Sequence, residues 1–145
     1  MKLVIKNGRV MDPASGRDEV TNVWVEDARI AGFGEHPEWE EEAETVNADG
    51  CVVAPGLVDV HVHFREPGHS EKETIHTGSL AAAHGGFTSV FAMPNVIPFP
   101  DDVDTIQNYL KLIEKESVVH THPYACITKE EASKEVVDMK AIKEL

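Results

Sequence analysis

The chain has 145 residues, a length that suits one ordinary domain. Its 13 basic and 26 acidic residues give a formal net charge of −13, which argues against a nucleic-acid surface and against binding to anionic lipid. The two cysteines form no disulfide framework, no apolar run approaches the ~20 residues of a membrane span, and the N-terminus lacks the apolar core of a signal peptide. We therefore expect a cytoplasmic protein that binds neither nucleic acid nor membrane.

Residues 1–54 read as short strands and turns, which predicts a small β-subdomain. Asn7-Gly8 is a strong tight-turn dipeptide, so we expect two short strands with a turn between them. The segment DPASG at residues 12–16 predicts a loop. A second hairpin is expected around residues 26–28, and residues 46–53 could add another strand.

From residue 57 the pattern changes to alternating strands and helices. Residues 57–64 form a largely apolar stretch that predicts a strand buried on both faces of a parallel sheet, and residues 88–93 predict the next buried strand. The segments 74–84 and 105–116 have the pattern of helices, and Gly85-Gly86 stops the first of them. This alternation favours an α/β fold with a parallel sheet and covering helices.

The last part of the chain predicts a third strand within residues 118–127. Thr128 is a plausible N-cap, with acidic residues in the first turn, and we expect its helix to run to the end of the chain. Residues 57–145 leave room for three β/α units, whereas a closed (β/α)₈ barrel needs ~250 residues. We therefore expect a truncated chain, the front part of something longer.

Two histidine pairs occur in the chain. Alternation along a strand lets His61 and His63 face the same way and point at one metal ion, near the carboxyl end of the strand, where active sites of parallel α/β folds gather. Neutral imidazole suits zinc, but a catalytic zinc usually has three protein ligands, so a further ligand must come from elsewhere. His120 and His122 lie near the start of their predicted strand, and we interpret them as structural or surface residues.

Two polar residues follow the predicted strands. The planar guanidinium of Arg65 can bind a carboxylate through two parallel hydrogen bonds. The alternative is that Arg65 forms a structural ion pair, for example with Glu66. Asn95 ends the second strand and should lie at the same rim as Arg65. Its amide suits an imide or a carboxylate, and simple turn chemistry before Pro98 is the alternative.

Through the segments that contain His61, His63, Arg65 and Asn95, the chain resembles the N-terminal part of the dihydroorotases, which belong to the amidohydrolase superfamily. Arg65 favours dihydroorotase over the hydantoinase-like and allantoinase-like relatives, whose equivalent segments usually lack this arginine. The resemblance covers nearly the whole chain, and it is specific because several motifs occur in order at the family's spacing. These motifs are APGLVDVHVHFREPG at 54–68, KET at 72–74, TGSLAAAHGGFTSV at 77–90 and AMPN at 92–95.

The resemblance implies a distorted (β/α)₈ barrel beside a small β-sandwich. Residues 1–54 would be part of the β-sandwich, and residues 55–145 would be the first three β/α units of the incomplete barrel. The reaction would be the zinc-dependent, reversible hydrolysis of the cyclic amide of dihydroorotate to N-carbamoyl-aspartate, in pyrimidine biosynthesis. The roles that the resemblance implies are zinc binding for His61 and His63, and binding of the substrate carboxylate for Arg65 and Asn95.

The resemblance also implies what this segment lacks. The family's bridging ligand, further histidines and catalytic aspartate lie beyond it, so we expect no catalytic residue here, weak or absent zinc and no activity of the chain alone. The chain also has Val96 where the family commonly has threonine. We expect it to associate with itself or with the remainder of the polypeptide. The alternatives are another cyclic amidohydrolase, acting on hydantoin, dihydropyrimidine or allantoin, or a non-catalytic dihydroorotase-like scaffold that binds a transcarbamoylase, such as aspartate transcarbamoylase, or another partner.

Overall fold

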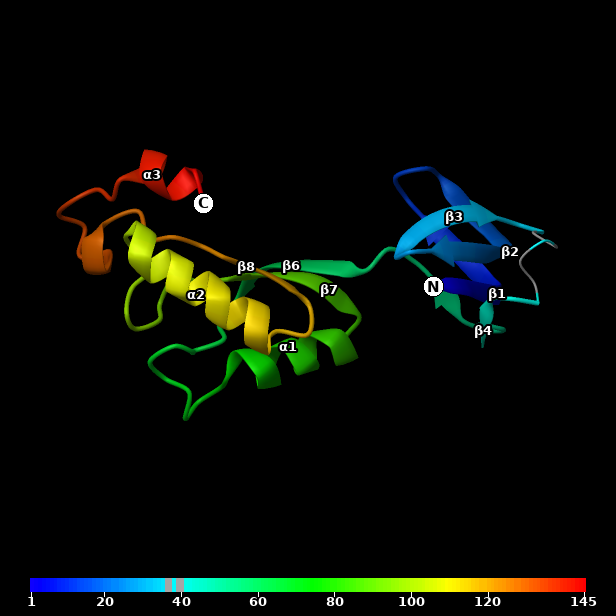
Figure 1. The fold of residues 1–145 in the computed structure, drawn as a ribbon, viewed down its shortest axis with the longest axis horizontal. Coiled ribbons are helices and arrows are strands. Elements are labelled where there is room, and N and C mark those ends of the chain that lie inside the picture. The colour runs from blue at the N-terminus through cyan, green and yellow to red at the C-terminus, as the bar shows by residue number, and fades with distance from the viewer. Residues whose placement is uncertain (36–37, 39–40) are drawn as a thin grey trace. The chain divides into compact units, whose positions relative to one another are not determined.

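The computed structural model describes residues 1–35, 38 and 41–145, which divide into two compact units, Met1–Pro55 and Gly56–Leu145. In this described part, no helix is long and apolar enough to cross a membrane. The first unit is built on one sheet, and the second combines helices with another sheet (Figure 1). The elements are β1 (Lys2–Asp12), β2 (Arg17–Glu26), β3 (Arg29–Phe33), β4 (Glu44–Asn47), β5 (Val52–Val53), β6 (Leu57–Val62), α1 (Ile75–His84), β7 (Phe87–Ala92), α2 (Val103–Glu116), β8 (His120–Pro123), η2 (Lys129–Glu131) and α3 (Met139–Lys143).

The sheet of the first unit has the strand order β3-β2-β1-β4, and β5 also pairs with β1. Strands β1 and β2 are antiparallel and are joined by a turn at residues 13–16, which confirms the predicted loop. The hairpin between β2 and β3 is also confirmed, with Asp27 and Ala28 at its tip in the left-handed region (φ 48° and 61°). Both β4 and β5 lie parallel to β1.

The predicted turn at Asn7-Gly8 is wrong, because β1 runs through it as one strand. Between Ile5 and Gly8 the pairing with β2 shifts register by one residue, which is the mark of a β-bulge, and Asn7 has a φ of 66°. The backbone N–H of Asn7 donates to Oδ1 of Asn22, and its side-chain amide donates to Oδ1 of Asn47. Partners on both sides of β1 thus hold the left-handed residue inside the sheet, where it makes a bulge rather than a turn.

The strand expected at residues 46–53 is divided into β4 and β5. The N–H of Ala48 still donates to the carbonyl of Lys6 (2.8 Å), and the N–H of Arg9 donates to the carbonyl of Cys51 (3.0 Å). Between these two bonds the chain makes a turn opposite the bulge of β1. The irregularity in β1 therefore interrupts the strand beside it.

The second unit contains a parallel sheet in the order β6-β7-β8, as the alternating pattern predicts. Helices α1 and α2 pack on one face of this sheet (Figure 1). The result is a mixed α/β fold, and the described residues form no closed barrel. The buried core between sheet and helices consists of Phe64, Ile75, Val90, Ala92, Val96, Tyr109 and Ile113.

The prediction that the first strand is buried on both faces is wrong for this chain. In β6, Leu57, Val58 and Val60 are 53%, 57% and 61% exposed. Among the described residues, strand β6 lies at the edge of the sheet and pairs only with β7. The apolar composition of β6 is therefore not explained by packing within the second unit.

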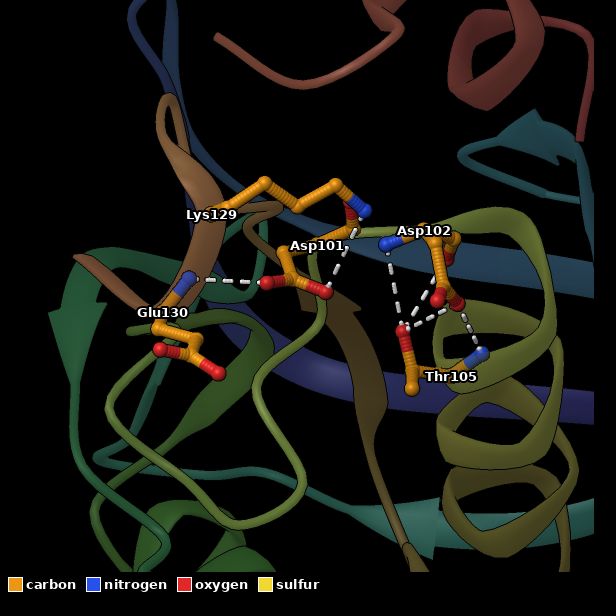
Figure 2. A network of polar contacts seen from close by, with 5 residues as sticks. All are labelled: Asp101, Asp102, Thr105, Lys129 and Glu130. Carbon is orange, nitrogen blue, oxygen red and sulfur yellow. Dashed lines mark hydrogen bonds and ion pairs between the residues drawn. The ribbon is translucent and has the colours of Figure 1, made fainter. Parts of the chain in front are cut away.

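Helices α1 and α2 begin at reciprocal caps. Thr74 caps α1 and Asp102 caps α2, and in each helix the side chain of the third residue, Thr77 or Thr105, bonds back to the cap. Helix α2 starts at Val103, two residues before the predicted start, because the side chain of Asp102 accepts the N–H of Thr105 (Figure 2). Helix α1 ends before Gly85-Gly86, as predicted.

The predicted helix from Thr128 to the chain end is wrong. The hydroxyl of Thr128 accepts the N–H of Ser133 across a loop, and Thr128 also bridges to Val136. Only the short η2 and α3 are helical in this region. Glu130 has a φ of 53°, a left-handed conformation that a continuous α-helix does not allow.

A contact with the start of α2 explains this loop. The carboxylate of Asp101, whose residue is only 8% exposed, accepts the backbone N–H of Glu130 at 2.8 Å. The amine of Lys129 donates to the backbone carbonyl of Asp101 at 2.9 Å and lies 3.8 Å from its carboxylate. Figure 2 shows Asp101 between these two residues. A carboxylate distant in sequence thus satisfies the backbone N–H of Glu130 in the loop that stands in place of the predicted helix.

Candidate metal and substrate site at the ends of β6 and β7

His61 lies on β6, and His63 follows directly after that strand. Their ring centroids are 5.1 Å apart in an edge-to-face arrangement. His61 is exposed and His63 is partly buried. Among the described residues, no cluster of three or more His, Cys, Asp or Glu could hold a metal ion. The two imidazoles are therefore a pair of candidate ligands rather than a complete set.

A β-bulge in β6 sets the direction of these histidines. Asp59 pairs with Val90 and Val62 pairs with Ala92, so β6 uses three steps where β7 uses two. The carboxylate of Asp59 accepts the backbone N–H of His61 at 2.9 Å. Bulges are common beside active sites because they re-aim side chains. The sequence pattern did not point to Asp59, and the available signal was a carboxylate two residues before the first histidine.

The loops that follow β6 and β7 meet at His63 and Asn95. Nδ1 of His63 lies 3.0 Å from Oδ1 of Asn95. The backbone N–H of Ile97 donates to the carbonyl of Pro67 at 3.0 Å, which ties the two loops together. Gly68 has a φ of 99°, and a Cβ there would lie 2.8 Å from the backbone of Ile97. Glycine therefore permits the close approach that brings Asn95 to His63.

Arg65 is partly buried, and no carboxylate among the described residues forms an ion pair with its guanidinium. The alternative pairing with Glu66 is not formed. The carboxylate of Glu66 accepts the hydroxyl of Ser70 at 3.0 Å and the backbone N–H of Ile75, the first residue of α1, at 2.9 Å. Because Glu66 stabilises the start of α1, the fork of Arg65 remains available for an external anion.

Two cavities of the second unit lie beside the histidines. His61 lines an open cavity of about 690 Å³ between β6 and the loop after β8. His63 lines a smaller one of about 250 Å³ together with Asp59 and Glu73. Neither Arg65 nor Asn95 lines either cavity. The polar groups that converge, rather than a single enclosed pocket, mark the candidate site.

Two buried hydroxyl and thiol groups of this unit are unsuited to acid–base or nucleophilic chemistry. Burial raises the pKa of Tyr109 to about 12, and the charge of Glu66 acts in the same direction. Burial also raises the pKa of Cys126 to about 11, with smaller contributions from Glu131 and Asp101. Cys126 lines the larger cavity, but its thiol stays protonated at neutral pH.

The second histidine pair lies where the sequence placed it for His120 but not for His122. His120 is the first residue of β8, as predicted, but the strand has only four residues, His120–Pro123, so His122 is near its carboxyl end. The ring of His122 lies 4.8 Å from the ring of Phe91 on β7. In the described residues no further ligand joins this pair, and both histidines are exposed.

The fold of the chain is similar to that of solved hydantoinases. The chain is similar to the solved structure of L-hydantoinase (dihydropyrimidinase) from Arthrobacter aurescens, with a TM-score of 0.76 and 25% identity over 87% of this chain and 28% of that one. It is also similar to a D-hydantoinase (dihydropyrimidinase) from a Thermus species, with a TM-score of 0.73 and 27% identity over 98% of this chain and 30% of that one.

A family model described as "Dihydro-orotase-like" matches residues 50–145, and the chain belongs to this family. It is 53% identical over 142 residues to a dihydroorotase of Streptococcus pneumoniae serotype 4, covering 98% of this chain and 33% of that protein. It is 47% identical over 141 residues to a dihydroorotase of Clostridioides difficile strain 630, covering 97% of this chain and 33% of that protein. The chain thus spans about a third of the length of the curated relatives it matches.

Proposed function

We propose that this chain supplies the zinc-binding histidine pair and the carboxylate-binding residues of a dihydroorotase. The reaction is the reversible hydrolysis of the cyclic amide of dihydroorotate to N-carbamoyl-aspartate. The observation that carries this proposal is the convergence of His61, His63 and Asn95 at the ends of adjacent parallel strands, with the unpaired Arg65 in the same loop. The high identity to curated dihydroorotases supports it.

His61 and His63 fit a role as two of the ligands of a zinc ion. Their rings are adjacent, and imidazole nitrogen is a preferred zinc ligand. A bound zinc lowers the pKa of its water towards ~7 and polarises the amide carbonyl. The bulge at Asp59 keeps the first histidine in place, and the contact with Asn95 holds the second.

Arg65 and Asn95 hold the substrate carboxylate. The guanidinium can form two parallel hydrogen bonds with a carboxylate, and the amide NH₂ can donate a further one. The formal net charge of −13 repels an anionic substrate, so binding depends on local positive charge. Anchored in this way, the ring presents its amide bond to the groups beside the histidines.

The proposed architecture explains the exposed strand. The first unit is part of a β-sandwich, and β6, β7 and β8 with their helices are the first units of a (β/α)₈ barrel. The side chains of β6 that are exposed in this chain become buried when later units of the barrel pack beside this strand. The remaining ligands and the general base come from those units, and the chain alone is inactive. We expect it to self-associate or to bind the remainder, and a well-folded monomer in light scattering would contradict this.

Hydrolysis of a different cyclic amide is the second candidate function, because both solved structures named above are hydantoinases. These substrates are cyclic amides that need not carry a carboxylate. The unpaired guanidinium of Arg65 favours a substrate that does.

A hybrid enzyme tests the proposal directly. Residues of this chain replace the aligned 142 residues of the Streptococcus pneumoniae relative. We expect the hybrid to bind zinc and to hydrolyse dihydroorotate much faster than dihydrouracil or hydantoin. His61→Ala and His63→Ala should abolish turnover, and Arg65→Ala should raise KM for dihydroorotate. A folded, zinc-loaded hybrid that prefers substrates without a carboxylate would support the second candidate instead.

A further inference from the structure

The contact between His63 and Asn95 defines which nitrogen of His63 carries hydrogen. Nδ1 of His63 lies 3.0 Å from Oδ1 of Asn95. A carboxamide oxygen has no hydrogen and can only accept. Nδ1 of His63 must therefore donate, and in the neutral ring the lone pair then belongs to Nε2.

The same bond also orients the amide of Asn95. With Oδ1 engaged by His63, the NH₂ group occupies the other edge of the planar carboxamide and is directed away from Nδ1 of His63. Among the described residues, no group accepts a hydrogen bond from this NH₂. A carboxylate can only accept hydrogen bonds, so it needs a donor. The NH₂ group of Asn95 is such a donor and is not used by His63.

We propose that Asn95 is a positioning residue for the metal as well as a ligand for the substrate. Its oxygen keeps His63 in the tautomer whose Nε2 can bind zinc, and its NH₂ is thereby directed to the substrate carboxylate. The side chain of Asn95 thus links the zinc ligand His63 to the substrate carboxylate. This inference rests on the proposed function and adds a role for Asn95 in zinc affinity.

The surroundings of Asn95 make such positioning physically reasonable. The next residue, Val96, is 1% exposed and packs in the core of the second unit. The residue after that, Ile97, bonds to the loop of Pro67. Because both following residues are fixed, Asn95 has little freedom to turn its amide away from His63. The valine that replaces the family's threonine at position 96 thus acts through packing.

Three variants of the hybrid enzyme separate the two roles. Asn95→Ala removes both the acceptor for His63 and the donor for the substrate, so zinc affinity should fall roughly 10- to 100-fold and KM should rise. Asn95→Asp keeps an acceptor towards His63 but turns a carboxylate towards the substrate, so zinc affinity should persist while KM rises at least about tenfold. Arg65→Ala is the matched control, with raised KM and unchanged zinc affinity.

The tautomer of His63 can be determined by NMR in the absence of metal and without an activity assay. In the 145-residue chain labelled with ¹⁵N-histidine, the ring nitrogen shifts of His63 should report a proton on Nδ1. His63→Gln identifies the signal. Asn95→Ala should shift the population towards the Nε2-protonated form, and Asn95→Asp should restore the original form.

The outcomes distinguish this inference from the proposed function. If the hybrid binds zinc and hydrolyses dihydroorotate, but Asn95→Ala has the zinc affinity of Arg65→Ala and an unchanged tautomer, the positioning role is refuted and the proposed function stands. If the unmodified hybrid folds but binds no zinc, the proposed function fails first. Reduced zinc affinity in Asn95→Ala together with rescue in Asn95→Asp supports the positioning role.

Discussion

Gly78 lies inside α1, directly against the ring of Phe64. A Cβ at this position would lie 2.5 Å from Cδ1 and 2.7 Å from Cε1 of that ring. In an open helix, glycine to alanine stabilises by about 1 kcal/mol, whereas overpacking a core costs about 1–3 kcal/mol. Phe64 is only 4% exposed and cannot easily move. Taking the upper part of that range, we expect Gly78→Ala to lower the free energy of unfolding by about 1–2 kcal/mol.

The two units allow a clean assay of this change. The described α-helices belong to the second unit, so the helical circular dichroism signal reports its unfolding in urea. Trp24 and Trp39 both precede residue 56, so tryptophan fluorescence reports the first unit and should be unaffected. Gly32→Ala is the control in the other unit, because Gly32 lies on β3 and a Cβ there meets nothing within 4 Å, so the helical transition should not change.

A gain of about 1 kcal/mol on Gly78→Ala, the value for an unobstructed helix, would refute the packing argument. Adding Phe64→Leu to Gly78→Ala tests the cause. The smaller side chain should relieve the clash, so the two substitutions together should cost less than the sum of their separate effects. Strict additivity would show that the alanine at 78 acts on something other than the ring of Phe64.

Asp59→Ala removes the acceptor for the backbone N–H of His61 and should weaken zinc binding of the hybrid roughly tenfold, whereas Asp59→Asn, which keeps an acceptor oxygen, should bind zinc as the parent does. If Asp59→Ala binds zinc as tightly as the parent hybrid, this hydrogen bond does not support the zinc site. Tyr109→Phe should raise the free energy of unfolding by about 1 kcal/mol, because the buried hydroxyl has no partner among the described residues. The pKa of Tyr109 is raised to about 12 in the folded chain, whereas the phenol of the unfolded chain ionises above ~10, so the free energy of unfolding of the parent chain falls as the pH rises from ~10 to about 12. The extra stability of Tyr109→Phe in urea melts should therefore grow over this pH range. A difference that does not change with pH would contradict this. At pH ~8, a thiol reagent should modify the exposed Cys51 and spare Cys126, because burial raises the pKa of the Cys126 thiol to about 11. Equal labelling of the two cysteines in mass spectrometry would show that Cys126 is not buried.

Much of the second unit could be predicted because its signals are local. The apolar runs, the helical spacing and the stop at Gly85-Gly86 act through neighbours in sequence, and they predicted β6, α1, β7, α2 and β8 in the right order. The adjacency of the strand-end residues also follows from topology, since neighbouring parallel strands bring their carboxyl ends to the same edge. Local patterns failed where the partner is distant, as at Asn7, whose bulge depends on strands β2 and β4.

The sequence by itself determined the family, the α/β alternation and the residue types at the ends of β6 and β7. The tertiary structure decided the rest, through bonds between residues far apart in the chain. The carboxylate of Asp101 accepts the N–H of Glu130, 29 residues later in the sequence, in the loop that stands where a helix was expected. Asn95 forms a hydrogen bond with His63, which lies 32 residues earlier in the sequence. Spacing along the chain encodes backbone bonds a few residues apart, but it does not encode which distant side chain will satisfy a buried polar group. The choice of partner depends on packing, which exists only in the folded chain.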